Sequence, residues 1–196
     1  MFEWLSRRMV ERGIIKEEEQ EIYQFGIWNG FIILLNIFTA FLIGLFTGKL
    51  WMVCVFTVFF MTLRSYTGGY HSDSRVFCYV GSNLVLFIPI YTVELFARMP
   101  DMVRMVVLGI SVGIILIYSP MHSKKRKLDE KEQRHFGRKA RIITAVQLMI
   151  FGVLYYLELT GYAYAIYASF CIIALLMLIG KIQLLLQFHM EKYSPF

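Results

Sequence analysis

Long apolar runs without a charged residue recur along the whole chain. A helix that spans a membrane needs about 20 mostly apolar residues, so each run is a candidate span. The second run is short and ends at Arg64; it spans only if the helix continues past Arg64, whose long side chain can reach the membrane surface. The pattern predicts an all-α membrane protein, a bundle of about six transmembrane helices. The runs cover residues 25–47, 50–63, 76–93, 105–123, 142–157 and 159–180.

The N-terminal segment before the first run has a different pattern. Phe2, Leu5 and Met9 recur at helical spacing, and charged side chains fill the other side. This predicts an amphipathic helix in the membrane interface, although a solvated helical tail would show a similar pattern. Acidic residues stand among the basic ones and no cleavage site follows an apolar core, so the segment is not a secretory signal.

The composition agrees with a membrane protein. Hydrophobic residues make up 58% of the 196 positions and charged residues 17%, against about 45–50% and about 25% in soluble domains. An ordinary soluble enzyme is therefore excluded, and with only three cysteines so is a disulfide scaffold. We expect a single domain over residues 1–196, with the interfacial helix in residues 1–24 and the bundle in residues 25–190.

The net charge of +6 is distributed unevenly. If the N-terminus is cytoplasmic, 17 of the 20 Lys and Arg lie on the cytoplasmic side of the six runs. Because cytoplasmic connections accumulate Lys and Arg, this predicts that both termini are in the cytoplasm. The largest cluster, residues 124–141, connects the fourth and fifth runs; Phe136 is its one aromatic residue, so nucleic-acid binding is not predicted.

The connection between the second and third runs carries the candidate chemistry. Residues 64–78 read RSYTGGYHSDSRVFC. Gly68 and Gly69 allow a sharp turn or a close approach of a ligand to the backbone. His71 and Cys78 follow, and a cysteine near a histidine is typical of a thiol nucleophile with its general base.

The spacing of His71 and Cys78 restricts how they can act together. On one continuous helix they would lie about 10 Å apart along the axis, whereas a nucleophile and its base need about 3 Å. Ser72, Asp73 and Ser74 are good N-cap residues, so the third span can begin at Ser74. Cys78 then lies in the first turn, where the helix N-terminus favours the thiolate, and His71 can fold back over it from the preceding loop.

The other cysteines and histidines have simpler interpretations. Cys54 and Cys171 lie in apolar runs and are expected to be packing residues. His122, His135 and His189 are expected to be solvated. Neither His-Glu-x-x-His nor Cys-x-x-Cys occurs, so we predict neither a metal nor a cofactor.

The residues of this connection resemble the accessory gene regulator protein B family, the AgrB peptidases of Gram-positive bacteria. The shared pattern is Arg64, the Gly68-Gly69 pair followed by a tyrosine and His71, and Cys78 seven positions after the histidine. The chain length, the several spans and the amphipathic start also agree, as does a Ser-Pro pair at residues 119–120 before a basic stretch. The resemblance extends over essentially the whole chain.

The resemblance implies a membrane-embedded cysteine endopeptidase. Such an enzyme would cleave the C-terminal tail from a short AgrD-type propeptide and promote its cyclisation to a thiolactone or lactone quorum-sensing autoinducer. Cys78 would be the nucleophile and His71 its general base, while Arg64, Gly68 and Gly69 would shape the site. The implied setting is a bacterial cell membrane, with the active site at the cytoplasmic interface and with the propeptide and the lipid bilayer as partners.

Two further sets of residues belong to the predicted site. Asp73 is near the pair and either contributes to the site or only caps the third span. Lys124, Lys125, Arg126 and Lys127 would dock the acidic tail of a peptide. The bland alternative is that this basic run only fixes the topology beside anionic headgroups.

Two other function classes stay open. The protein could be a peptide transporter or exporter with the basic run as a vestibule, or a non-catalytic membrane scaffold in which Cys78 only packs. Gly109 and Gly113 form a small-xxx-small pair that could pack helices within or between protomers, so a homodimer is a further expectation.

Overall fold

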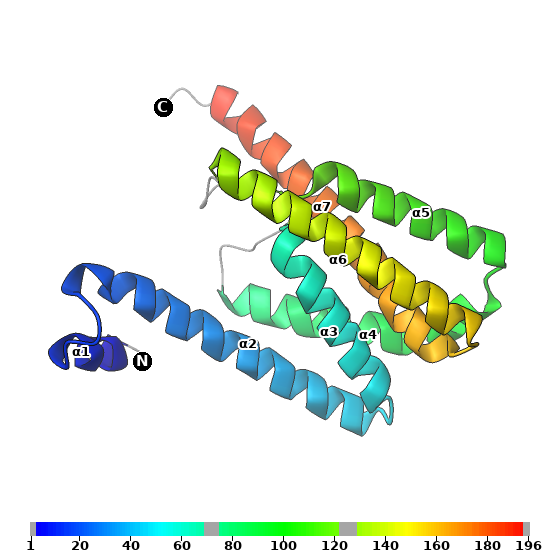
Figure 1. The fold of residues 1–196 in the computed structure, drawn as a ribbon, viewed down its shortest axis with the longest axis horizontal. Helices are drawn as coiled ribbons and strands as arrows, with labels where there is room; N and C mark the ends of the chain where they lie inside the picture. Colours follow the sequence, from blue (N-terminus) through cyan, green and yellow to red (C-terminus); the bar gives the residue numbers. More distant parts are fainter. Residues whose placement is uncertain (1–2, 69–74, 122–128, 194–196) are drawn as a thin grey trace.

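The computed structural model describes residues 3–68, 75–121 and 129–193, and helices make up nearly all of them (Figure 1). These ranges contain no strand and include six helices that are long and apolar enough to cross a membrane. The prediction of an all-α membrane bundle with six spans is confirmed. The elements are α1 (Glu3–Glu11), the short 3-10 helix η1 (Glu17–Glu19), α2 (Gln20–Phe46), α3 (Leu50–Thr67), α4 (Arg75–Arg98), α5 (Asp101–Tyr118), α6 (Glu130–Tyr156) and α7 (Thr160–Tyr193).

Several helix boundaries differ from those of the apolar runs. α3 continues past Arg64 to Thr67, as a spanning second helix requires. α2 begins at Gln20, so the first 24 residues are not one interfacial segment. α6 begins at Glu130, so much of the basic run is helix rather than connection. Lys, Arg, Glu, Gln and Ala are good helix formers, and the Asp129 N–H donates to the Glu132 side chain at 3.3 Å in a capping arrangement.

The core of the bundle lies along α7, which packs against α3, α4, α5 and α6 (Figure 1). Its residues 163–170 are all buried, so this stretch is covered on every side. Three of the eight are alanines, which let neighbouring helices approach closely. Phe56 and Leu63 of α3 are fully buried in the same core. Large side chains such as Phe38 and Ile117 are exposed on the outside, which is expected of a surface that faces lipid.

The N-terminal helix α1 packs against α2 and keeps an apolar and basic surface exposed. Trp4 is 60% exposed, and the Arg8 guanidinium lies 4.2 Å from the centre of its ring. The buried position of α1 is Ser6, whose hydroxyl donates to the Glu3 carbonyl. This surface suits contact with headgroups, and the interfacial position of α1 stays a prediction.

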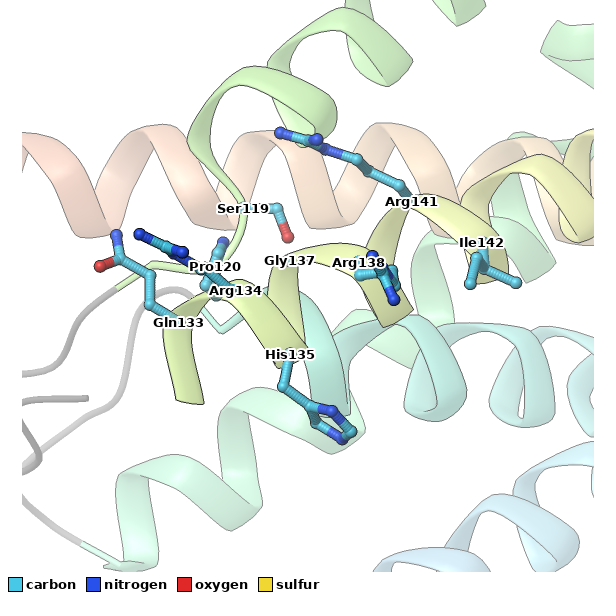
Figure 2. Close-up of a pocket in the computed structure, with 9 residues that line it drawn as sticks. All are labelled: Ser119, Pro120, Gln133, Arg134, His135, Gly137, Arg138, Arg141 and Ile142. Carbon is cyan, nitrogen blue, oxygen red and sulfur yellow. The ribbon is translucent and has the colours of Figure 1, made fainter. Parts of the chain in front are cut away.

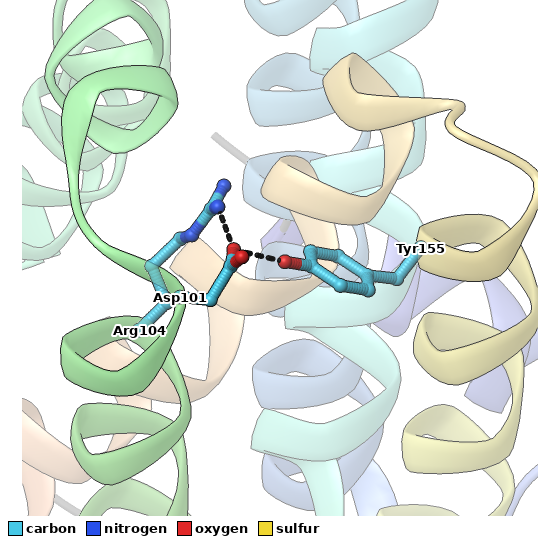
Figure 3. A network of polar contacts seen from close by, with 3 residues as sticks. All are labelled: Asp101, Arg104 and Tyr155. Carbon is cyan, nitrogen blue, oxygen red and sulfur yellow. Dashed lines mark hydrogen bonds and ion pairs between the residues drawn. The ribbon is translucent and has the colours of Figure 1, made fainter.

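Three side chains tie together the end of the bundle where α5 begins and α6 ends (Figure 3). Arg104 forms an ion pair with Asp101, and the Tyr155 hydroxyl donates to the same carboxylate at 2.5 Å. The Arg104 guanidinium also lies over the rings of Phe96, at 5.0 Å, and Tyr155, at 5.6 Å. One arginine thus links α4, α5 and α6 at the end opposite to the C-termini of α3 and α5.

The residues that were expected to pack behave differently from one another. Cys171 lies against α5, where the Ser111 hydroxyl donates to its sulfur at 3.6 Å, and Cys54 is half-buried on α3. A Cβ added at Gly109 or Gly113 would meet nothing within 4 Å. These glycines therefore do not bring helices together within the described part of the chain, and a homodimer through them stays a prediction.

Candidate functional site

The candidate site begins where α3 ends. Gly68 follows the last helical residue with φ +71° and ψ −151°, a conformation that is essentially restricted to glycine. Its N–H donates to the Arg64 carbonyl at 3.3 Å, and the Arg64 guanidinium donates to the Gly68 carbonyl. Two of the predicted site residues are therefore in direct contact, and both fix the direction in which the chain leaves α3.

The end of α3 is joined to the segment that follows α5. The Met121 N–H donates to the carbonyl of Thr67, a fully buried residue, at 2.9 Å. A Cβ added at Gly68 would lie 2.6 Å from the Met121 carbonyl oxygen, which is closer than real Cβ atoms approach. Glycine is thus required at this position twice, by its backbone conformation and by the neighbouring backbone.

α6 closes the other side of the same segment. A Cβ added at Gly137 would lie 3.2 Å from Cδ of Pro120. The ring of Phe136 lies 6.2 Å from that of Tyr66 on α3, and the Lys139 ammonium lies 5.5 Å from the centre of the Tyr66 ring. We call the contacts of Thr67 and Gly68 with residues 119–121, together with Gly137, the junction.

The start of α4 is held by a separate set of polar contacts. The hydroxyls of Thr39 on α2 and Tyr79 on α4 are hydrogen-bonded at 2.8 Å. One turn further along α4, the Asn83 amide donates to the Asn36 side-chain oxygen at 3.2 Å. The backbone of Cys78 precedes Tyr79 in the first described turn of α4, so its position in the bundle is fixed by the contacts between α2 and α4.

The remaining predicted site residues lie outside the part of the chain that the structure describes. They are Gly69, His71, Asp73, Lys124, Lys125, Arg126 and Lys127, together with the side chain of Cys78 and the predicted Ser74 cap. The described flanks nevertheless carry one finding. Because Met121 contacts Thr67 and Gly68, the chain enters residues 69–74 and residues 122–128 from one place in the fold.

A cavity of about 900 Å³ lies beside the junction (Figure 2). None of its lining residues was singled out as a site residue by the sequence. Two features could have drawn attention to it: arginines that recur on one face of the helix, and a glycine within a strongly helix-forming stretch. The lining consists of Ser119, Pro120, Gln133, Arg134, His135, Gly137, Arg138, Arg141 and Ile142.

Comparison with known proteins agrees with the pattern around residues 64–78. A family model described as accessory gene regulator B matches residues 2–184. The chain belongs to the AgrB family. The match to AgrB takes in α1 to α6, most of α7, the junction and both predicted parts of the site.

One curated relative of this AgrB family member is accessory gene regulator protein B of Staphylococcus aureus (strain MW2). It is 31% identical over 81 residues, which are 40% of this chain and 43% of the relative. The aligned stretch therefore covers less than half the length of that protein. No solved structure matches the chain. Within the described ranges, no group of three or more His, Cys, Asp or Glu side chains could hold a metal ion.

Proposed function

We propose that this AgrB family member is a membrane-embedded cysteine endopeptidase. It cleaves the C-terminal tail from a short quorum-sensing propeptide of the AgrD type and promotes closure of a thiolactone or lactone ring. Cys78 is the nucleophile and His71 is its general base. The observation that supports this proposal most is the junction, because it joins the chain segments from which the predicted catalytic and docking residues follow.

The proposed reaction consists of two acyl transfers. His71 takes the proton from Cys78 Sγ, and the thiolate adds to the scissile carbonyl carbon. The carbon–nitrogen bond then breaks, the leaving amine takes the proton from the imidazolium, and the tail departs. The remaining peptide is held as a thioester on Cys78. A cysteine or serine side chain of the peptide attacks that carbonyl, its proton passes to the imidazole and then to Cys78, and the ring closes as the enzyme is released.

The fate of the thioester depends on water, because hydrolysis would give a linear product. A site at the end of the bundle, beside the membrane surface, can limit the access of water to the acyl group. We place this site and both termini on the cytoplasmic side, on the strength of the 17 Lys and Arg assigned to that side. The junction holds the flank of the His71 segment, and the Thr39–Tyr79 contact holds α4 next to Cys78.

The activation of Cys78 can be tested directly, because the chain has only three cysteines. In membranes that contain the full chain, a limiting amount of an alkylating reagent should modify Cys78 roughly tenfold faster than Cys54 or Cys171. Peptide mass spectrometry measures the three rates. His71→Ala should slow modification of Cys78 while the rates of the other two stay unchanged. Equal rates for Cys78 with and without His71 would favour the transporter or scaffold alternatives.

The basic run should contribute to substrate binding through its charge. Replacing Lys124, Lys125, Arg126 and Lys127 together by glutamine should weaken processing of an acidic-tailed propeptide. The loss should be larger at low ionic strength, where the attraction of the native run is less screened. Rates of tail release at 20–300 mM salt measure the effect, with salt concentrations of about one to three Debye lengths' range as the guide.

A matched control removes the same number of charges elsewhere. Glutamine at the four basic residues of the N-terminal segment changes the net charge equally and leaves the run intact. Processing that is unchanged at low salt in the first variant would reduce the basic run to a topology signal. The control residues are Arg7, Arg8, Arg12 and Lys16.

A further inference from the structure

Three arginines follow one face of α6 beside residues 119–120 (Figure 2). Arg134, Arg138 and Arg141 are spaced i, i+4 and i+7, so they lie on successive turns of the same side of the helix. Helical geometry places Arg138 and Arg141 about 4.5 Å apart along the axis and Arg134 about 6 Å beyond Arg138. All three are exposed, and none forms an ion pair with another residue in the described ranges. Like charges at this spacing repel each other and favour a bound anion.

The cavity of about 900 Å³ offers these arginines a ligand site without a competing carboxylate. No Asp or Glu is found among its described lining residues, while Gln133 and Ser119 add polar groups. The Ser119 hydroxyl oxygen is buried and has no hydrogen-bond partner in the described part of the protein. A volume of this size suits a small organic ligand rather than a single ion.

The same face of α6 becomes apolar immediately after Arg141. Ile142 lines the cavity and is 55% exposed, and no charged residue follows before Glu158. Ala145 and Met149 continue the face one and two turns further on, and both are exposed. Arg141 therefore stands at the boundary between the charged and the apolar part of the helix, which is the level of lipid phosphates.

We propose that this cavity binds the headgroup of an anionic phospholipid. Arg138 and Arg141 hold the phosphate, which guanidinium groups can bind with two hydrogen bonds each. An acyl chain then lies along the exposed apolar face that Ala145 and Met149 form. A basic pocket between helices at the membrane surface is a typical headgroup site. The apolar continuation favours a lipid over an acidic peptide, whose carboxylates would need no such surface.

Binding can be measured with the purified full chain in micelles of a neutral detergent. The probe is fluorescent phosphatidylglycerol, and phosphatidylcholine serves as the neutral lipid. The wild-type protein should bind phosphatidylglycerol in preference to phosphatidylcholine. Arg138→Gln/Arg141→Gln should weaken this binding roughly tenfold, because it removes charge-assisted hydrogen bonds. The measurement needs no propeptide, so its outcome is independent of the proposed peptidase activity.

A matched control removes two charges from the same helix away from the cavity lining. Lys131→Gln/Lys139→Gln should change the affinity less than about threefold, since exposed charges act weakly at a distance. If the glutamine variant of the arginines does not fold, Arg138→Lys/Arg141→Lys keeps both charges and should still bind more weakly, because lysine lacks the bidentate fork.

Four results would overturn the proposal. The first is equal binding of the two lipids, and the second is an equal loss in the Lys131 and Lys139 control. The third is competition by glycerol 3-phosphate at the concentration of the lipid itself, which would indicate a site for phosphate without an acyl chain. The fourth is displacement of the lipid by a peptide of glutamates whose own binding depends on Arg138 and Arg141, which would make the cavity a peptide site.

Discussion

Alanine in place of Cys78 should abolish removal of the propeptide tail, and alanine in place of His71 should slow it by about 10²–10⁴-fold. Without the sulfur no thioester can form, so both tail release and ring closure stop. Without the imidazole the thiol remains but loses the group that takes its proton. Single-turnover assays in membranes, with a tagged propeptide, measure tail release, and mass spectrometry of the intact protein detects the acyl-enzyme.

The other two cysteines provide the matched controls for this result. Cys54→Ala and Cys171→Ala should process the propeptide at nearly the native rate, with at most a small loss of stability because both lie within helices. The loss should be larger at Cys171, whose sulfur accepts a hydrogen bond from Ser111. Native rates in Cys78→Ala would contradict the thiol mechanism and favour a transporter or a scaffold.

The fold could be predicted from the sequence because its main signal is hydrophobic length. Runs without charge identify helices that must cross a membrane, and they require no knowledge of tertiary contacts. The boundaries were less certain, since charge does not end a helix. Arg64 lies within α3, and Glu130 begins α6 although residues 130–141 are strongly charged. In both places the backbone follows helix propensity, which the apolar pattern does not report.

The candidate site could be predicted only in part. The His71–Cys78 pair is local in sequence, so spacing and helix geometry suffice to propose it. The junction is not local: it brings Thr67 and Gly68 against Met121, more than fifty positions later. Only packing of α3 and α5 onto α7 places these residues together, and a single sequence carries no direct signal of that contact. The Gly68-Gly69 pair indicated a turn but not the backbone that passes over it.

The junction makes a second prediction with a large effect. Gly68→Ala should lower the rate of propeptide processing by roughly 10²-fold, because a small displacement of the catalytic segment is enough to misalign the reacting groups. The new methyl group would stand 2.6 Å from the Met121 carbonyl oxygen, so backbone must move on one side or the other. The glycine-specific conformation adds strain of about 1–3 kcal/mol. The single-turnover assay measures the rate, and size-exclusion chromatography shows that the protein is folded.

Glycines elsewhere in the chain separate the two causes. Gly13 also has a positive φ, +68°, but a Cβ there would meet nothing within 4 Å, so Gly13→Ala tests conformational strain alone. Gly152, within α6, has open space and no positive φ, and Gly152→Ala should leave processing unchanged. Gly137→Ala brings a Cβ to 3.2 Å from the Pro120 ring and should have an intermediate effect. If Gly68→Ala processed the propeptide no more slowly than Gly13→Ala, contact with Met121 would not position the catalytic segment, and the main structural support for the proposed site would be lost.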